Sequence, residues 1–199
     1  MAIDIRQIEN TIGYSFRNKD LLQQAFIRKS YSQENGSQNN EVLEFIGDKA
    51  LDFAVIRLMM NRFGKITKDK QWDEFKLTNP QYFQTRIGEG KFTDIKRMLV
   101  EKRALSGCMD RLGFHTQLIM GRGDIIKKVE NEKSVKEDLF EAIIGAVALD
   151  SNYDMDTITE VVNTMLDLDS FFDNGEFDED YDFNYIGWIQ EWSQGEGYG

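Results

Sequence analysis

Apolar residues recur at helical spacing along most of the chain, so the predicted fold class is all-α. Two of the predicted helices, residues 41–62 and 135–150, are apolar on nearly every side, which is typical of buried helices. Asn18-Lys19-Asp20 is typical of a cap and predicts where the second helix begins. The pattern also predicts an amphipathic helix over residues 4–17, a basic helix over 92–105, a helix and turn over 107–119, and a final helix over 154–172.

The helix predicted over residues 41–62 carries an acidic stripe. Glu41, Glu44 and Asp48 follow one another at i, i+3 and i+7, which at about 100° per residue places them within an arc of roughly 60°. Apolar residues occupy the other sides of the helix. Because burying several carboxylates is prohibitive unless positive charge meets them, the stripe requires a cation or a basic partner.

The helix predicted over residues 135–150 repeats this conflict. Asp138 and Glu141 are again spaced i and i+3, and Gly145 completes the stripe at i+7. A glycine at that position allows the backbone of another helix to come close. Two buried helices that face each other through these stripes would therefore bring Asp138 and Glu141 together with Glu44 and Asp48.

Four hard oxygen donors without Cys or His suit Mg²⁺, or Mn²⁺ in its place, better than zinc. Magnesium held by carboxylates is the usual equipment for chemistry on phosphate esters. For either stripe alone, a solvated acidic face is an equally good interpretation. Taken together, both stripes lie in apolar helices with little room for a wet side, which favours a metal site.

At these residues the chain resembles the ribonuclease III family. Glu41-Val-Leu-Glu44-Phe-Ile-Gly-Asp48 is similar to the family's signature stretch, and Asp138-Leu-Phe-Glu141-Ala-Ile-Ile-Gly-Ala is similar to its second acidic motif. Several ordered motifs at compatible spacing are more specific than any one of them. The resemblance runs from about Ile8 to Asp150, continues weakly to Phe172, and includes Ile12-Gly-Tyr-Ser-Phe16, Leu21-Leu-Gln-Gln-Ala25, Arg28-Lys-Ser-Tyr31, Glu89-Gly-Lys-Phe-Thr93 and Met120-Gly-Arg-Gly-Asp124.

The resemblance implies a mostly helical catalytic domain over residues 1–172 that hydrolyses double-stranded RNA to 5′-phosphate and 3′-hydroxyl ends in RNA processing. It implies two-fold homodimers in which each subunit cuts one strand and Phe45 packs at the interface. The alternative for Phe45, a place in the core of its own chain, stays open. The implied site consists of the metal ligands Glu44, Asp48, Asp138 and Glu141, with Asp48 and Glu141 catalytic, and of Glu41 and Glu89 in outer-shell or substrate-binding roles.

Two readings compete with an active nuclease. One is an RNA-binding or ribosome-assembly module that keeps the fold and has lost catalysis, although such a module would be expected to lose at least one of the four acids. The other is a structural helical dimer whose acids hold a stabilising divalent ion. Lys49 and Glu137 depart from the family pattern beside the site and leave the level of activity open.

The net charge of −11 is unevenly distributed. Residues 1–136 contain all 24 basic residues and 18 acids, a balance of +6, whereas residues 137–199 contain 17 acids and no Lys or Arg. The acidic total therefore does not exclude an RNA-facing basic surface on the first part of the chain.

Residues 64–88 form a longer link than the family pattern leads us to expect. Lysines alternate there with Trp72 and Phe75, a mixture that could contact RNA phosphates, although a surface excursion whose aromatics pack back on the core is the simpler interpretation. Residues 173–182 are expected to be an acidic linker. Residues 183–199 resemble the first helix of a double-stranded-RNA-binding domain, as if the chain were truncated or had lost the remainder of that domain.

Other features restrict the function. Cys108 is the single cysteine, which excludes an internal disulfide and fits a reducing compartment. His115 is the single histidine and lies outside both acidic motifs, so catalysis by a histidine base is not expected. No apolar segment approaches the length of a membrane span or a secretion signal. We therefore expect a soluble cytoplasmic protein.

Overall fold

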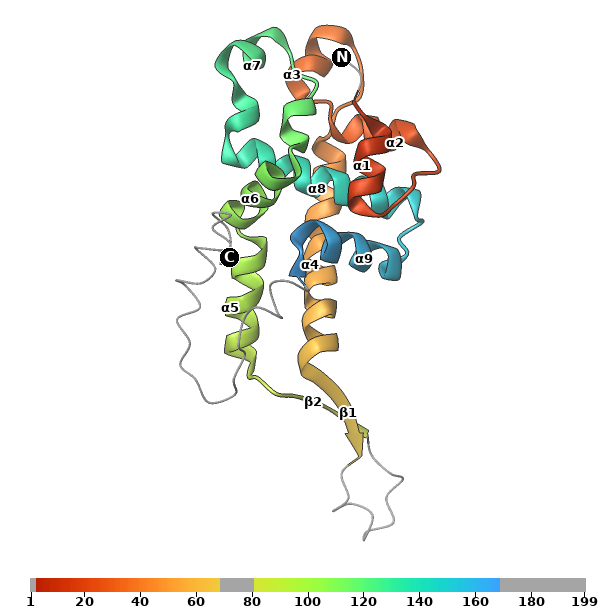
Figure 1. Ribbon diagram of the computed structural model, residues 1–199, viewed down its shortest axis with the longest axis vertical. Helices are drawn as coiled ribbons and strands as arrows, with labels where there is room; N and C mark the ends of the chain where they lie inside the picture. The colour runs from red at the N-terminus through yellow and green to blue at the C-terminus, as the bar shows by residue number, and fades with distance from the viewer. Residues whose placement is uncertain (1–2, 69–80, 169–199) are drawn as a thin grey trace.

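The computed structural model describes residues 3–68 and 81–168. Within these ranges the chain is mostly helical, as the sequence predicts, and includes one short two-stranded sheet (Figure 1). The elements are α1 (Ile5–Ile12), α2 (Lys19–Ala25), α3 (Lys29–Asn35), α4 (Glu41–Phe63), β1 (Gly64–Lys68), β2 (Gln81–Thr85), α5 (Glu89–Val100), α6 (Lys102–Leu112), η2 (Phe114–Gln117), α7 (Arg122–Lys127), η3 (Val129–Asn131), α8 (Lys133–Asp150) and α9 (Met155–Leu166).

The centre of the molecule is the packing of α4 against α8, around which α2, α6 and α9 are arranged. The middle of α8 is buried on every side, since each residue from Ala142 to Ala148 is enclosed. α4 is buried along one side only, through residues such as Leu51, Val55 and Met59. The prediction of two central apolar helices is therefore confirmed for α8, whereas α4 also presents a face to solvent.

Helix boundaries follow local chemistry. The side chain of Asn18 accepts a hydrogen bond from the backbone N–H of Asp20, which confirms the predicted cap of α2. Asp4 caps α1 by accepting from the backbone N–H of Gln7. α1 ends at Gly13, where φ is 71°, and not at residue 17 as predicted.

Two further predicted helices differ from the structure. The basic helix predicted over residues 92–105 is divided, because Glu101 adopts an extended conformation with ψ of 150° between α5 and α6. The break allows Leu99 of α5 and Leu105 of α6 each to reach the core. The final helix ends at Leu166, where Asp167 takes a left-handed conformation, so the single helix predicted over residues 154–172 is interrupted at residue 167.

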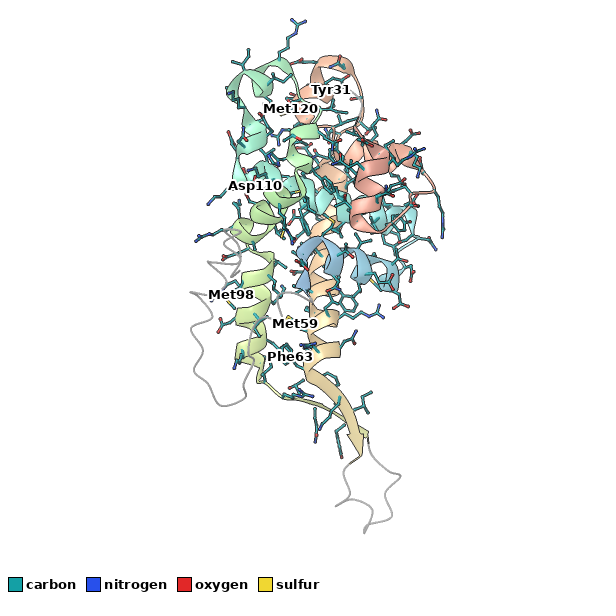
Figure 2. All side chains as sticks on the ribbon, in the orientation of Figure 1. Tyr31, Met59, Phe63, Met98, Asp110 and Met120 are labelled. Atoms are coloured by element: carbon teal, nitrogen blue, oxygen red, sulfur yellow. The ribbon has the colours of Figure 1, made fainter. Side chains whose placement is uncertain are left out.

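The link over residues 64–88 contains an antiparallel pair of strands that the all-α prediction lacked. Gly64 pairs with Thr85 and Ile66 with Phe83, and the hairpin projects beyond the helices (Figure 1). At its base, Phe63 of α4 meets Phe92 of α5 edge to face. Figure 2 shows Phe63 and Met98 where α4 and α5 lie alongside each other. The predicted phosphate-contacting residues Lys70, Trp72, Phe75 and Lys76 lie outside the described residues.

The C-terminal end of α8 is tied to the segment before α2. The Asp150 carboxylate accepts hydrogen bonds from the Tyr14 hydroxyl (2.7 Å) and from the backbone N–H groups of Arg17 and Asn18 (2.8 Å each). Burial raises the pKa of this carboxyl, but the hydrogen bonds outweigh burial and hold it below its ordinary value of 3.8. Asp150 is thus a structural acid.

The remaining sequence expectations concern isolated residues and the ends of the chain. Cys108 is buried, and burial raises the pKa of its thiol to about 11, so it is a core residue. His115 contacts the carbonyl oxygen of Met109 through Nδ1 at 3.0 Å. The predicted linker (173–182) and the segment 183–199 lie outside the described residues. None of the helices in the described ranges has the length and apolar character of a membrane span.

Candidate metal centre

The site begins with two glycines at the crossing of α4 and α8. A Cβ atom added to Gly47 would lie 1.7 Å from the carbonyl oxygen of Glu141, and one added to Gly145 would lie 1.9 Å from the carbonyl oxygen of Leu43. Neither position accepts any side chain, because the obstructing atoms belong to backbone. The expected role of Gly145 as a close-approach residue is confirmed, and Gly47 has the matching role on α4.

This crossing brings the acids of the two helices into one electrostatic group. Burial, together with the nearby carboxylates of Asp48, Glu137, Glu44 and Asp138, raises the pKa of Glu141 from its ordinary value of 4.5 to about 8. A carboxyl with that pKa is largely protonated at neutral pH unless a cation joins it. Glu141 is therefore the group whose charge is least compensated by the chain itself.

The same causes act on two other members of the group. Burial, and then the charges of Asp138 and Glu41, raise the pKa of Glu44. Burial also raises the pKa of Asp138, although the Arg28 guanidinium opposes the shift. The charges of Asp48, Glu44 and Asp138 thus all act on Glu141, and the charge of Asp138 acts on Glu44, so the four predicted acids are electrostatic neighbours across the crossing.

Two lysines border the acids. The Lys49 ammonium donates to the Asp48 carboxylate at 2.6 Å, and this hydrogen bond raises the pKa of Lys49. Lys102, at the start of α6, pairs with Glu137 at 2.9 Å, and that hydrogen bond raises the pKa of Lys102. Both ammonium groups are on exposed side chains and are only partial counter-charges.

Arg28 supplies a third positive charge, and its guanidinium is held in place by Asp124. Its Nε donates to Asp124 at 3.0 Å, while Nη1 lies 3.9 Å from Asp138. Ser30 donates to the same oxygen of Asp124 at 2.6 Å, and the guanidinium and hydroxyl lower the pKa of Asp124 against its burial. α3 and α7 are thereby joined at the end of the molecule where Figure 2 shows Tyr31 and Met120.

The donor set fits a hard divalent ion. Its members are carboxylates only, and burial, followed by neighbouring carboxylates, raises the pKa values of Glu44, Asp138 and Glu141, which is the environment that Mg²⁺ or Mn²⁺ relieves. As they lie, no three carboxylate, imidazole or thiol side chains in residues 3–68 and 81–168 stand close enough together to hold a metal ion. α4 and α8 therefore cross closely, as expected, but the four acidic side chains do not converge on one point in this structure.

The other predicted site residues lie around this centre. Glu41 is exposed and accepts from Lys29 at 2.8 Å, although its charge reaches Glu44. Glu89 begins α5 and accepts from the Thr93 hydroxyl at 3.3 Å, and in the described part of the chain it is not among the main charges acting on Glu44, Asp138 or Glu141. The outer-shell or substrate-binding role of Glu89 stays a prediction.

Phe45 lies on the outer face of α4. Its side chain is 69% exposed, which removes the alternative that it packs in the core of its own chain. Val42, Phe53 and Ile56 are exposed on the same face, since they recur at helical spacing with Phe45. We call Val42, Phe45, Phe53 and Ile56 the α4 stripe.

Sequence reasoning missed Arg28 and Lys102 as members of the site. Both were visible only as parts of larger features, Arg28 in the opening motif and Lys102 in a basic helix. Their approach to Asp138 and Glu137 depends on how α3 and α6 pack against α8. No residue spacing within one helix carries that information.

Comparison with known proteins agrees with this arrangement. The family model described as Ribonuclease-III-like matches residues 18–167. The protein named Ribonuclease 3 from Roseburia hominis is 48% identical over 192 residues, which are 96% of this chain and 52% of that protein. The protein of the same name from Treponema succinifaciens is 44% identical over 168 residues, 84% of this chain and 42% of that protein. The chain therefore belongs to the ribonuclease III family, as the motifs predicted.

A solved structure supports the fold. The nuclease domain of ribonuclease III from Campylobacter jejuni aligns with a TM-score of 0.65 at 24% identity, covering 83% of this chain and 97% of that one. The mostly helical nuclease-domain fold is thereby confirmed. The chain spans about half the length of the curated relatives quoted above.

Proposed function

We propose that this chain is the catalytic domain of a divalent-ion-dependent endoribonuclease that cleaves double-stranded RNA to 5′-phosphate and 3′-hydroxyl ends during RNA processing. The observation that carries the proposal is the group of mutually interacting carboxylates at the α4–α8 crossing. Membership of the ribonuclease III family gives the same reaction class. A cytoplasmic location, expected from the sequence, agrees with an RNA substrate.

Glu44, Asp48, Asp138 and Glu141 are the proposed ligands of Mg²⁺, with Mn²⁺ able to take its place. When bound, the ion supplies Lewis acidity that makes a coordinated water acidic and stabilises charge on the phosphodiester. Among the protein's own groups, Asp48 and Glu141 are the proposed catalytic acids, because each interacts with the other across the crossing.

The bordering cations have a defined part in this proposal. Arg28 limits the negative charge at Asp138 from one side and Lys102 limits it at Glu137 from another. Duplex RNA brings further negative charge to the site, so cations within the acidic group ease its approach. Recognition would rest on phosphates and 2′-hydroxyls of the A-form minor groove, with little dependence on sequence.

We further propose that two copies associate through the α4 stripe. Val42 and Phe45 on one side of the exposed Lys49, and Phe53 and Ile56 on the other, place four exposed apolar side chains on one helix face, which favours a surface that binds protein. A two-fold axis through such a row makes the same residues contact themselves, which is the commonest symmetry of homo-oligomers. Each subunit would then offer one acidic centre to one strand of a duplex.

The test of the reaction is cleavage of a blunt RNA duplex with Mg²⁺ titrated from zero. The protein is expected to cut only with the ion present, and Glu141→Gln is expected to reduce the rate by at least 100-fold, the scale for loss of one transition-state-stabilising group. Glu160→Gln, an exposed glutamate of α9, is the matched control and should cut at the wild-type rate. Analysis of the product ends checks the chemistry.

Two outcomes contradict this proposal. Duplex binding without cutting at any Mg²⁺ or Mn²⁺ concentration supports the non-catalytic RNA-binding module. Cutting that Glu141→Gln leaves intact removes the carboxylate group at the crossing from the mechanism.

A further inference from the structure

The exposed apolar surface of α4 does not end at Ile56. Met60 follows four residues later, one helical turn further along the same face, and is half-buried. α4 ends at Phe63, and the chain passes directly into β1 at Gly64. The hairpin therefore follows directly from the helix that carries the α4 stripe.

The register of the hairpin places two exposed apolar side chains on one face. Ile66 lies directly opposite Phe83, so both side chains share one face, and they are 69% and 56% exposed. The next pair, Lys65 and Gln84, faces the other side. Tyr82 is also on this second face, because side chains alternate along a strand. We call Ile66 and Phe83 the hairpin patch.

The hairpin patch is continuous with the α4 stripe through Gly64. A Cβ atom on Gly64 would lie 2.4 Å from Cζ of Phe83 and 2.6 Å from the carbonyl oxygen of Met60. The Phe83 ring therefore covers Gly64, where α4 becomes β1, one helical turn after Met60. Ile56, Met60 and Phe83 thus form a path from the stripe onto the hairpin.

The hairpin patch is suited to bind protein and not RNA. An isolated two-stranded hairpin is marginally stable in water, and Figure 1 shows this one projecting past the helices. An A-form duplex presents phosphates and 2′-hydroxyls, which offer nothing to an isoleucine and a phenylalanine. The hairpin patch is continuous with the α4 stripe, through which we propose that two copies associate. The second copy bound at the α4 stripe is therefore the partner that can also contact the hairpin patch.

We propose that the hairpin is an arm of the dimer, in which Ile66 and Phe83 of each subunit pack on the second copy of this chain. The inference rests on the proposed association through the α4 stripe. Two-fold symmetry forms the arm contact twice, so each apolar residue removed from the arm weakens the dimer at two places. The arm thereby adds to the interface without touching the acidic centre.

Sedimentation velocity across a concentration series, without RNA, tests the arm. Phe83→Ser and Ile66→Ser should each raise the dimer dissociation constant at least tenfold. Tyr82→Ser removes an exposed aromatic from the opposite face of the same strand and should change it less than twofold. Equal constants for wild type and both hairpin-patch variants overturn the proposal, and so does an equal effect of Tyr82→Ser.

Phe45→Ser separates this inference from the dimer on which it rests. If Phe45→Ser dissociates the protein while the hairpin-patch variants do not, the dimer stands and the arm is rejected. If the wild type is a monomer at every concentration, both are rejected. Should Phe83→Ser leave the dimer intact and weaken duplex binding, the hairpin is an RNA contact and the arm is rejected.

A second measurement covers the case in which serine disturbs the strands. A photo-reactive benzoylphenylalanine at position 66 is expected to cross-link two copies, detected as peptides joining ¹⁴N and ¹⁵N chains in a mixed sample. The same group at position 65, on the opposite face of the hairpin, is the control. Cross-links confined to one chain at position 66 contradict the arm.

Discussion

α8 carries Asp150 at its C-terminal end and Asp138 and Glu141 near its N-terminal end, and these carboxylates meet different surroundings. Asp150 is 8% exposed and accepts from one hydroxyl and two backbone N–H groups, and its pKa is lowered. Glu141 faces other carboxylates and has its pKa raised to about 8. The same helix therefore holds one acid whose carboxylate accepts hydrogen bonds from the fold, Asp150, and another whose charge is opposed by neighbouring carboxylates, Glu141.

The difference teaches how to separate structural from functional acids. A buried carboxylate that stabilises a fold has donors directed at it, so its ionised form is favoured. A carboxylate whose main neighbours are other carboxylates destabilises the fold when ionised, and its retention needs another explanation. The divalent cation that we propose at the α4–α8 crossing would supply that explanation.

The largest change is expected from Gly145→Ala, which affects the support of the centre itself. The added methyl group would meet the Leu43 carbonyl oxygen at 1.9 Å, and neither backbone can yield without separating α4 from α8. We expect a loss of about 3 kcal/mol in the free energy of unfolding, together with loss of cleavage. Urea unfolding followed by circular dichroism measures the first. Unaltered stability would show that the helices do not cross so closely.

Asp150→Asn comes next and should act on stability alone. The amide retains one acceptor oxygen for three donors, so the free energy of unfolding at neutral pH should fall by about 2 kcal/mol. Because the folded pKa lies below 3.8, this contribution is present above that value and is lost as pH falls through the lowered pKa. Chemical unfolding at pH 7 and pH 3 should give a smaller deficit in acid. Impaired divalent-ion binding would place Asp150 in the functional group.

In the metal-free protein, Glu141→Gln should raise the free energy of unfolding, whereas the two preceding substitutions lower it. The substitution removes a charge repelled by Asp48 and Glu44, and a gain of about 1 kcal/mol is expected at pH 8. Since the folded pKa is raised from 4.5 to about 8, the wild type loses stability as pH rises through this window, and the variant lacks that slope. Melting temperatures of the wild type and the variant, measured in a chelator from pH 5 to 8.5, check this difference in pH dependence. Parallel profiles contradict the account.

Lys102→Met should have the smallest effect. The Lys102 side chain is half exposed and its charge is screened by solvent, so stability should change by less than about 1 kcal/mol. Removing a positive charge next to the acids should tighten Mg²⁺ binding about threefold. Lys133→Met, an exposed lysine at the start of α8, is the control. Weaker Mg²⁺ binding in Lys102→Met would mean that the ammonium group supports the site in another way.

Much of the centre was predictable from residue spacing. The i, i+3 and i+7 pattern placed Glu44 and Asp48 on one stripe, and Gly145 on the other stripe predicted the close approach that the structure has. Both features are properties of a single helix, and helical periodicity is local information. The Asn18 cap was predictable for the same reason.

Other features depend on packing between distant segments and were not predictable. Arg28 reaches Asp138 only because Asp124 and Ser30 hold its guanidinium from another part of the chain. The break at Glu101 has no glycine or proline to announce it, since it results from burying residues of α5 and α6 in one core. The β1–β2 hairpin was hidden by a sequence without strict alternation of apolar residues.

Calorimetric titration of Mg²⁺ into the metal-free protein and into Glu141→Gln at pH 7.5 tests the central claim most directly. The wild type should bind the ion with release of protons, because a carboxyl with a pKa of about 8 must ionise to take part. Glu141→Gln should bind at least tenfold more weakly and without that proton release. Equal affinity and equal proton release in the two proteins would contradict a divalent-ion site at the crossing of α4 and α8.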